Sequence, residues 1–204
     1  MSAASGAYLG TSDFAATVLG ILASSGHRPA LAVTLPDRKQ GRGRKVSPSP
    51  VATAAEELGI EVFKCGDVNQ PEARERILAA GGEWASICAF GQLIKEPLLT
   101  DLPMLNVHPS LLPRWRGAAP IERSIMAGDE QTGVCVMRLV AGLDSGPVAM
   151  REATAIEPGE DFGSLSERLA RIGGDLLVKA LDGAADRSIE WTEQVDSEAT
   201  YAEK

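Results

Sequence analysis

A chain of 204 residues is long enough to bury a sizeable core. Its composition, with 44% hydrophobic and 24% charged residues, is that of a globular domain and excludes wholesale disorder. The formal net charge of −8 argues against a general nucleic-acid binder. No apolar run reaches the roughly eighteen residues of a membrane span, and the start of the chain lacks the basic-then-apolar pattern of a signal peptide.

Short apolar runs alternate with helical patterns along the chain. These runs predict strands over residues 7–9, 31–35, 62–64, 86–90, 105–108, 134–139 and, as an edge strand, 148–151. The first is the weakest, because Ala3, Ala4 and Gly6 supply no β-branched side chain. The alternation predicts an α/β fold with a Rossmann-like, doubly wound, mostly parallel sheet and flanking helices.

Helices are predicted between these strands from apolar spacing and from end signals. The first covers residues 14–24 behind Ser12 or Asp13 as cap, and the second covers residues 50–58 behind Ser49. The third covers residues 72–80 and ends at two glycines. The last starts at a capping box, residues 164–167 (SLSE), and is expected to pack across the sheet and to stop near Gly183.

The number and spacing of the cysteines and histidines indicate which kinds of site we expect. Cys65, Cys88 and Cys135 are odd in number and widely separated, so we interpret them as small buried hydrophobic residues in a reducing cytoplasm. The chain has two histidines and no paired metal-ligand spacing. We therefore expect neither a disulfide framework nor a catalytic metal.

Residues 106–113 (NVHPSLLP) contain the strongest candidate for a catalytic site. Alternation along a strand puts Asn106 and His108 on one face, so both point beyond the strand end, where doubly wound sheets bind ligands. A glycine-bounded turn over residues 142–146 (GLDSG) presents one carboxylate, Asp144. Taken singly, an Asn-x-His pair more often satisfies loop carbonyls, and a turn aspartate is more often solvated.

The string over residues 106–113, followed by RWRGAAPI over residues 114–121, resembles the folate-dependent formyltransferases. Asp144 is similar to that family's third catalytic residue. LGTSDF over residues 9–14 and TYAEK at the end resemble the branch that acts on initiator methionyl-tRNA for translation initiation. The resemblance implies the formyltransferase fold, 10-formyltetrahydrofolate as the formyl donor, and Asn106, His108 and Asp144 as catalytic residues.

These three side chains also suit formyl transfer on physical grounds. An amine that attacks a formyl carbon produces a developing oxyanion, to which Asn106 can donate an N–H and a protonated His108 a second, charged donor. Asp144 can hold the imidazole, favour its protonated form and assist proton movement from the amine to the leaving nitrogen. No covalent enzyme intermediate is required.

The resemblance also implies a folate-binding wall. The pterin would lie against Phe90 and Gly91 and the turn around Asp144, and the adjoining wall would be formed by Ser110, Leu111, Leu112 and Pro113. A core aromatic residue followed by a strand-ending glycine explains Phe90 and Gly91 equally well. Trp115 and Arg116 could face the substrate or pack the loop, and we favour packing for Trp115.

Residues 36–45 form the most basic segment and are expected to be a loop, neither helix nor strand, because they are polar and rich in glycine. From residue 38 to residue 45 there are five cations and no acid: Arg38, Lys39, Arg42, Arg44 and Lys45. The plain interpretation is a solvated surface loop. The functional one is a flexible basic finger that binds tRNA phosphates, with Arg42 reaching base edges.

The finger separates the methionyl-tRNA branch from a formyltransferase that acts on a small amine, such as a glycinamide ribonucleotide or an amino sugar. A second alternative is a noncatalytic RNA-binding fragment, and the candidate catalytic side chains argue against it. A nucleotide-binding dehydrogenase is excluded, because Gly6-x-x-x-Gly10 is not the glycine spacing that cradles a pyrophosphate.

We expect a catalytic domain over residues 1–183 and a linker or extension over residues 184–204. The resembled family continues from its Tyr-Ala-Glu-Lys segment into a small β-barrel domain, so we interpret the chain as truncated and expect weaker tRNA binding than a longer protein would show. We further expect a cytoplasmic monomer, with initiator methionyl-tRNA and the folate donor as partners and no membrane contact.

Overall fold

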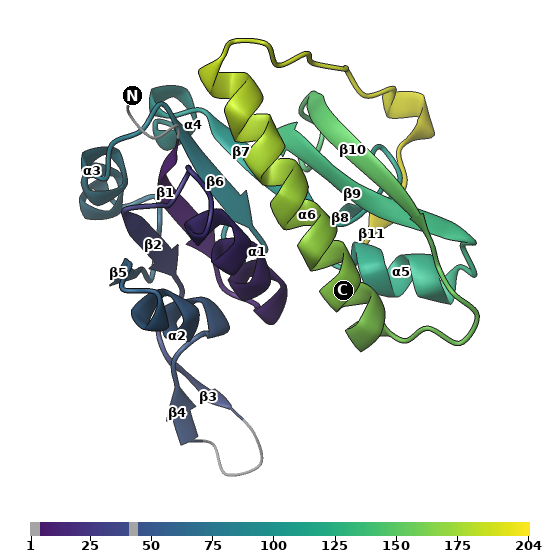
Figure 1. Cartoon of the computed structure of the whole chain (residues 1–204), viewed down its shortest axis with the longest axis horizontal. Coiled ribbons are helices and arrows are strands. Elements are labelled where there is room, and N and C mark those ends of the chain that lie inside the picture. Colours follow the sequence, from purple (N-terminus) through teal and green to yellow (C-terminus); the bar gives the residue numbers. More distant parts are fainter. Residues whose placement is uncertain (1–4, 41–44) are drawn as a thin grey trace. The chain divides into compact units, whose positions relative to one another are not determined.

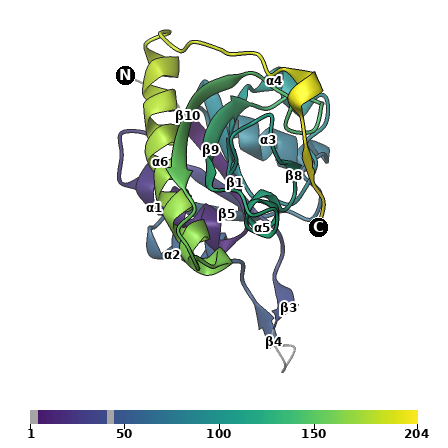
Figure 2. The same ribbon diagram turned by 90° about the vertical axis from the view of Figure 1, so that its right-hand side faces the viewer.

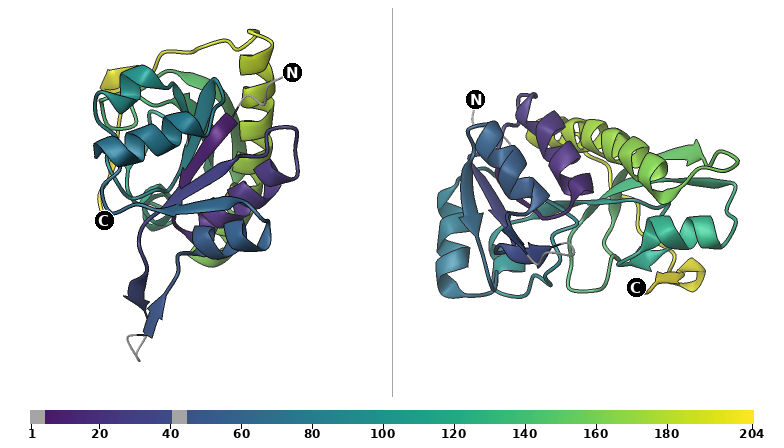
Figure 3. Two further views of the ribbon diagram at one scale, coloured as in Figure 1. Left: turned by 90° about the vertical axis from the view of Figure 1, so that its left-hand side faces the viewer. Right: turned by 90° about the horizontal axis from the view of Figure 1, so that it is seen from below.

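The computed structural model describes residues 5–40 and 45–204, and the chain divides into two compact units, Met1–Met104 and Leu105–Lys204. The first unit contains a sheet in the order β6-β1-β2-β5, with all neighbouring strands parallel. Right-handed crossovers place α1 and α2 on one face of this sheet and α3 on the other (Figures 1 and 3). The elements are β1 (Ser5–Gly10), α1 (Asp13–Ala23), β2 (Leu31–Thr34), β3 (Arg38–Gln40), β4 (Lys45–Ser47), α2 (Pro50–Glu57), β5 (Glu61–Lys64), α3 (Pro71–Ala79), β6 (Trp84–Cys88) and α4 (Leu98–Asp101).

Strand β1, the weakest of the predicted strands, lies in the middle of this sheet between β6 and β2. Ala7, Tyr8 and Leu9 are fully buried, and the Tyr8 hydroxyl donates to the carbonyl oxygen of Ala15 at 2.6 Å. Burial on both faces of a parallel sheet outweighs a weak intrinsic strand preference. The prediction of a strand here is therefore confirmed.

The helices of the first unit begin where their caps predict. Ser12 Oγ accepts a hydrogen bond from the Ala15 amide at 3.3 Å, and Ser49 Oγ accepts one from the Ala52 amide at 3.0 Å. Each bond satisfies one of the amide groups that the first turn of a helix leaves unpaired. The predicted bounds of α1, α2 and α3 agree with the observed ones to within one residue at each end.

The expectation that residues 36–45 are neither helix nor strand is wrong at both flanks of the segment. Strand β3 pairs antiparallel with β4, with Arg38 opposite Ser47 and Lys39 opposite Val46, and the pair projects from the rest of the first unit (Figures 1 and 2). A two-stranded ribbon needs only backbone hydrogen bonds, so a polar composition does not prevent it. Residues 41–44, which include Arg42 and Arg44, lie outside the described residues.

The second unit has a sheet in which β9 lies antiparallel between β7 and β10, and β10 is the edge strand that the sequence predicts. Its elements are β7 (Met104–His108), β8 (Arg116–Gly117), α5 (Pro120–Met126), β9 (Gln131–Arg138), β10 (Val148–Ala155), α6 (Phe162–Ala185), the 3₁₀ turn η1 (Asp196–Glu198) and β11 (Tyr201–Ala202). The parallel sheet of the first unit has helices on both faces, and the second unit adds antiparallel strands. This arrangement confirms the predicted α/β fold class.

Helix α6 packs on β9 and β10 through a face that contains the fully buried Leu165, Leu169 and Leu177 (Figure 2). The predicted start of this helix at Ser164 is wrong. Asp161 is the cap, since its Oδ1 accepts from the Ser164 amide at 2.9 Å, and Ser164 is already the third residue of the helix. A carboxylate in this position also interacts favourably with the helix dipole.

After α6 the chain returns along the second unit. Thr192 pairs with Val148, and β11 pairs in parallel with β8, with Tyr201 opposite Arg116 and Ala202 opposite Gly117. The role of residues 184–204 as a linker stays a prediction. Across the described residues, no helix combines the length and the apolar character needed to cross a membrane.

Candidate active site

Strand β7 brings the two predicted catalytic side chains to one place. Asn106 and His108 alternate with the buried Leu105 and Val107, and both face Asp144, which comes from the turn between β9 and β10. Asn106 Nδ2 lies 3.5 Å from Asp144 Oδ1, and His108 Nδ1 lies 3.7 Å from Asp144 Oδ2. The side chain of His108 is 5% exposed and that of Asp144 is 14% exposed. The second unit thus gathers a carboxamide, an imidazole and a carboxylate in a largely desolvated cluster.

The imidazole of His108 is oriented by a backbone carbonyl. Its Nε2 lies 2.9 Å from the carbonyl oxygen of Trp115. A carbonyl oxygen can only accept, so the hydrogen-bond network assigns a proton to Nε2. The distance from Nδ1 to Asp144 is longer than a hydrogen bond. Nδ1 is therefore the ring nitrogen that remains for a substrate atom placed beside the carboxylate.

The carboxylate of Asp144 is held by the backbone of β8. Its Oδ2 accepts a hydrogen bond from the Gly117 amide at 2.9 Å. Gly117 has φ +117, and a Cβ there would lie 2.9 Å from the carbonyl oxygen of Ala202, so the close approach of β11 favours a glycine. Asp144 itself has φ +43, in the left-handed region that non-glycine residues seldom adopt.

Trp115 packs against the surrounding loop, as the sequence analysis favours. Its ring lies under the guanidinium of Arg114 at 4.4 Å, and its Nε1 donates to Asp129 Oδ2 at 2.8 Å. Asp129 also accepts two hydrogen bonds from Arg114, and these bonds, followed by the one from Trp115, lower the pKa of its carboxyl group. The side chain of Trp115 therefore stabilises the loop whose carbonyl group orients His108.

Arg116 is almost fully buried, with 3% of its surface exposed. Its guanidinium donates to Gln194 Oε1 at 3.0 Å and to Asp196 Oδ1 at 2.8 Å. A buried cation needs such partners, because desolvation without them is costly. Of the two possibilities left open for Arg116, its burial favours loop packing.

The predicted folate contacts near β7 divide into buried and half-buried residues. Ser110 is fully buried and its hydroxyl donates to the Arg114 carbonyl at 2.6 Å, while Leu112 packs in an apolar cluster with Cys135, Met137 and Val148. Leu111 and Pro113 are half-buried. The two leucines and their neighbours thus form a wall in which only alternate side chains reach the surface.

The predicted folate contacts in the first unit follow β6. Phe90 is buried, at 2% exposure, and its carbonyl oxygen accepts from Thr11 Oγ1 at 2.8 Å. Gly91 is exposed, with φ +85. The burial of Phe90 fits the interpretation of this residue as a core aromatic. A contact between Phe90 and a pterin stays a prediction.

The basic residues of segment 36–45 that the structure describes lie on β3 and β4. Arg38 and Lys39 are exposed on β3, and Lys45 begins β4. The described part of the ribbon therefore presents cationic side chains to solvent. No group of three or more His, Cys, Asp or Glu side chains suited to a metal ion occurs among the described residues.

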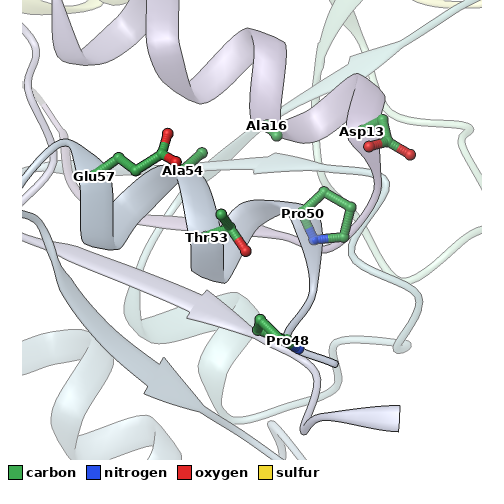
Figure 4. Close-up of a pocket in the computed structure, with 7 residues that line it drawn as sticks. All are labelled: Asp13, Ala16, Pro48, Pro50, Thr53, Ala54 and Glu57. Carbon is green, nitrogen blue, oxygen red and sulfur yellow. The ribbon is translucent and has the colours of Figure 1, made fainter. Parts of the chain in front are cut away.

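A separate pocket lies between α1 and α2 of the first unit (Figure 4). Its lining contains two carboxylates and no cation, and it is formed by Asp13, Ala16, Pro48, Pro50, Thr53, Ala54 and Glu57. Because it includes none of the predicted site residues, it does not alter the assignment of the candidate active site to the second unit.

Sequence reasoning missed three residues that support the site: Gly117, Gln194 and Thr200. Gln194 Nε2 donates to the carbonyl oxygens of Asp144 and Gly146, at 2.8 and 2.7 Å, and the Trp115 amide donates to Thr200 Oγ1 at 2.8 Å. All three bonds join residues that are far apart in the chain. The segment around Gln194 has neither helical nor strand periodicity, so no local signal marks it.

Two proteins named methionyl-tRNA formyltransferase are similar to this chain over nearly its whole length. The methionyl-tRNA formyltransferase of Methylococcus capsulatus is 43% identical over 199 residues, which are 97% of this chain and 65% of that protein. That of Halorhodospira halophila is 46% identical over 200 residues, which are 97% of this chain and 64% of that protein. The chain thus spans slightly less than two thirds of the length of these relatives.

The fold and the family can be assigned separately. The crystal structure of glycinamide ribonucleotide transformylase 1 from Symbiobacterium toebii has the same fold, with a TM-score of 0.73 at 20% identity over 92% of this chain and 93% of that one. The sequence model of the formyl transferase family matches residues 7–181, a stretch that includes Asn106, His108 and Asp144. This chain belongs to the formyl transferase family.

Proposed function

We propose that this chain transfers a formyl group from 10-formyltetrahydrofolate to the amino group of initiator methionyl-tRNA. The observation that carries the proposal is the convergence of Asn106 and His108 on Asp144 in a largely buried cluster. The 43–46% identity to methionyl-tRNA formyltransferases supports the choice of acceptor. Formyl transfer is the chemistry that a pair of hydrogen-bond donors beside one carboxylate can assist without a covalent intermediate.

In the proposed reaction the amino nitrogen forms a bond to the formyl carbon, and the bond from that carbon to the donor nitrogen breaks. Negative charge develops on the formyl oxygen while the carbon is tetrahedral. Asn106 Nδ2–H and His108 Nδ1–H supply two donors to this oxygen. The imidazole is positioned before the reaction, because its Nε2 is held by the Trp115 carbonyl oxygen, and Asn106 Nδ2 already lies beside Asp144 Oδ1.

Asp144 supplies the charge that balances a protonated His108. Its Oδ2 is anchored on the Gly117 amide, so the carboxylate keeps its place beside the imidazole. The attacking amine must also lose a proton and the leaving nitrogen must gain one. We propose that Asp144 passes this proton, directly or through water, so that the reaction is balanced without a net proton change in the site.

The predicted folate contacts remain part of the proposal. Leu111 and Pro113 are half-buried and would touch the pterin, while the buried Ser110 and Leu112 would shape the wall behind them. Gly91, with Phe90 before it, would offer exposed backbone to the same ligand.

We propose tRNA as the acceptor because of the basic residues in the segment of β3 and β4. Arg38, Lys39, Arg42, Arg44 and Lys45 would contact tRNA phosphates, and the overall charge of −8 would confine this binding to the ribbon and make it sensitive to salt. A small amine is the second candidate acceptor, because the chain shares its fold with a glycinamide ribonucleotide transformylase. A small amine gives no reason for a projecting cationic ribbon, so tRNA is preferred.

We place this activity in a cytoplasmic monomer. The three cysteines are buried free thiols, which suits a reducing compartment.

The proposal is tested by following formyl transfer from 10-formyltetrahydrofolate to methionyl-tRNA with the unaltered chain and with His108→Ala. We expect transfer by the unaltered chain and a loss of roughly 10²–10³ in rate for the variant, as for the removal of one oxyanion donor. Glycinamide ribonucleotide and an amino sugar serve as competing acceptors. Faster transfer to either small amine would overturn the tRNA assignment, and equal rates for the unaltered chain and the variant would overturn the site.

A further inference from the structure

Two non-glycine residues of the candidate active site have left-handed backbone conformations: Trp115, with φ +61, and Asp144, with φ +43. Such conformations persist only where surrounding contacts hold them. Each residue provides a group beside His108, namely the Trp115 carbonyl oxygen at Nε2 and the Asp144 carboxylate at Nδ1. The geometry of the imidazole therefore depends on two backbone segments that would relax if released.

One segment, the C-terminal strap (residues 192–203), contacts both. At its start the Thr192 amide donates to the Val148 carbonyl at 2.9 Å, and the Val148 amide donates back at 2.8 Å. At its end β11 pairs with β8. Between these anchors, Gln194 bonds to the turn that contains Asp144, and Thr200 Oγ1 accepts from the Trp115 amide. The strap thus reaches both left-handed residues from a fixed frame.

Gln194 links the two segments directly. Its Nε2 donates to the carbonyl oxygens of Asp144 and Gly146, and its Oε1 accepts from Arg116 Nε, in the residue that follows Trp115. Only a carboxamide can donate two N–H groups on one side and accept on the other. A carboxylate would keep the bond to Arg116 and would face two carbonyl oxygens with no proton to donate.

We propose that Gln194 is a positioning residue for formyl transfer: by joining the Asp144 turn to the Trp115–Arg116 segment, it sets the distance between the Asp144 carboxylate and the His108 imidazole. This inference rests on the proposed function and deepens it. Gln194 touches no reacting atom in this scheme. It acts through the two groups that flank the imidazole.

The expected effect follows from how steeply such sites depend on geometry. Displacement of a catalytic group by about 1 Å costs up to about 10²-fold in rate, and loss of a partner that orients a ligating or catalytic group costs about 10–100-fold. For Gln194→Leu and Gln194→Glu we expect kcat to fall by about 10–100-fold, because of this displacement. The KM for each substrate should change by less than about threefold, because the strap residue binds neither substrate directly.

A double-mutant cycle separates positioning from general stability. In the His108→Ala background, Gln194→Leu should reduce kcat by a clearly smaller factor than in the unaltered chain, because the imidazole whose distance to Asp144 it sets is gone. Arg168→Met is the matched control in the same unit. It removes a side chain that likewise bonds a carbonyl oxygen, of Ala155 at 2.8 Å, and a loop carboxylate, of Glu160 at 2.6 Å. The control should lower the melting temperature and leave kcat unchanged.

A second readout does not require activity. The chain has two histidines, so the ring resonances of His108 and His27 can be resolved by NMR. Gln194→Leu should move the His108 ring resonances and leave those of His27 in place, whereas Arg168→Met should move neither. Unmoved His108 resonances, or an equal loss of kcat with and without His108, would overturn the inference. If the unaltered chain transfers no formyl group, the proposed function fails, and the NMR comparison still decides whether Gln194 positions the imidazole.

Discussion

The charge of Asp144 provides the sharpest test of the site. Asp144→Asn keeps the size of the side chain and an oxygen that can accept from the Gly117 amide, but it removes the negative charge 3.7 Å from His108 Nδ1. Two unit charges at this distance attract each other by about 4 kcal/mol at an effective dielectric constant of about 20. The side chain is only 14% exposed, so solvent screens the pair incompletely.

The attraction accelerates the reaction only to the extent that it is stronger in the transition state than in the ground state. If half or more of it is expressed there, kcat falls by roughly 30-fold to 10³-fold, since about 1.4 kcal/mol corresponds to a factor of ten. The measurement is steady-state formyl transfer to methionyl-tRNA by the unaltered chain and the variant, with both substrates saturating.

The matched control is Asp161→Asn, which makes the same chemical change at the cap of α6, where asparagine is an equally good cap. We expect this control to change kcat by less than about twofold, because the cap preference is retained. If Asp144→Asn kept its fold, judged by thermal unfolding, and transferred formyl groups within about threefold of the unaltered rate, the electrostatic role assigned to Asp144 would be refuted.

Three further predictions concern stability and reactivity. The hydrogen bonds from Arg114 lower the pKa of Asp129. The stability that this pair contributes is therefore present above the ordinary aspartate pKa of about 3.9 and is lost as pH falls through the lowered pKa. The difference in melting temperature between the unaltered chain and Asp129→Asn should accordingly shrink below about pH 4. Burial raises the pKa of Cys88 to about 12 and that of Cys135 to about 11, so a thiol reagent at pH 8 should react slowly with both in the native protein and rapidly after unfolding; fast native labelling would contradict their burial. A Cβ at Gly133 would lie 2.2 Å from the Glu152 carbonyl oxygen on β10, so Gly133→Ala should lower the free energy of unfolding by about 1–3 kcal/mol in urea titrations, while Gly26→Ala, with no atom within 4 Å of its Cβ, should be nearly neutral.

Much of the fold is visible in the sequence, because burial imposes a local periodicity. The apolar spacing and the serine caps of α1 and α2 predict both helices to within one residue, and alternation predicts that Asn106 and His108 share a face. The failures are also physical. Residues 38–40 form a strand in spite of their polarity, because backbone pairing with β4 does not depend on apolar side chains. Asp161 replaces Ser164 as the cap of α6, because several polar residues near a helix start compete for the same amides.

The sequence by itself determined the α/β class, most element bounds and the pairing of Asn106 with His108 on one strand face, since these follow from spacings of two to four residues. The tertiary structure alone decided what surrounds the imidazole. Trp115 presents its carbonyl oxygen to Nε2, and Gln194 and Thr200 reach back to hold Asp144 and Trp115 from a segment with no periodic pattern. Such contacts join residues far apart in the chain. They depend on the packing of β7, β8 and the strap in three dimensions, which no local rule of hydrophobic spacing encodes.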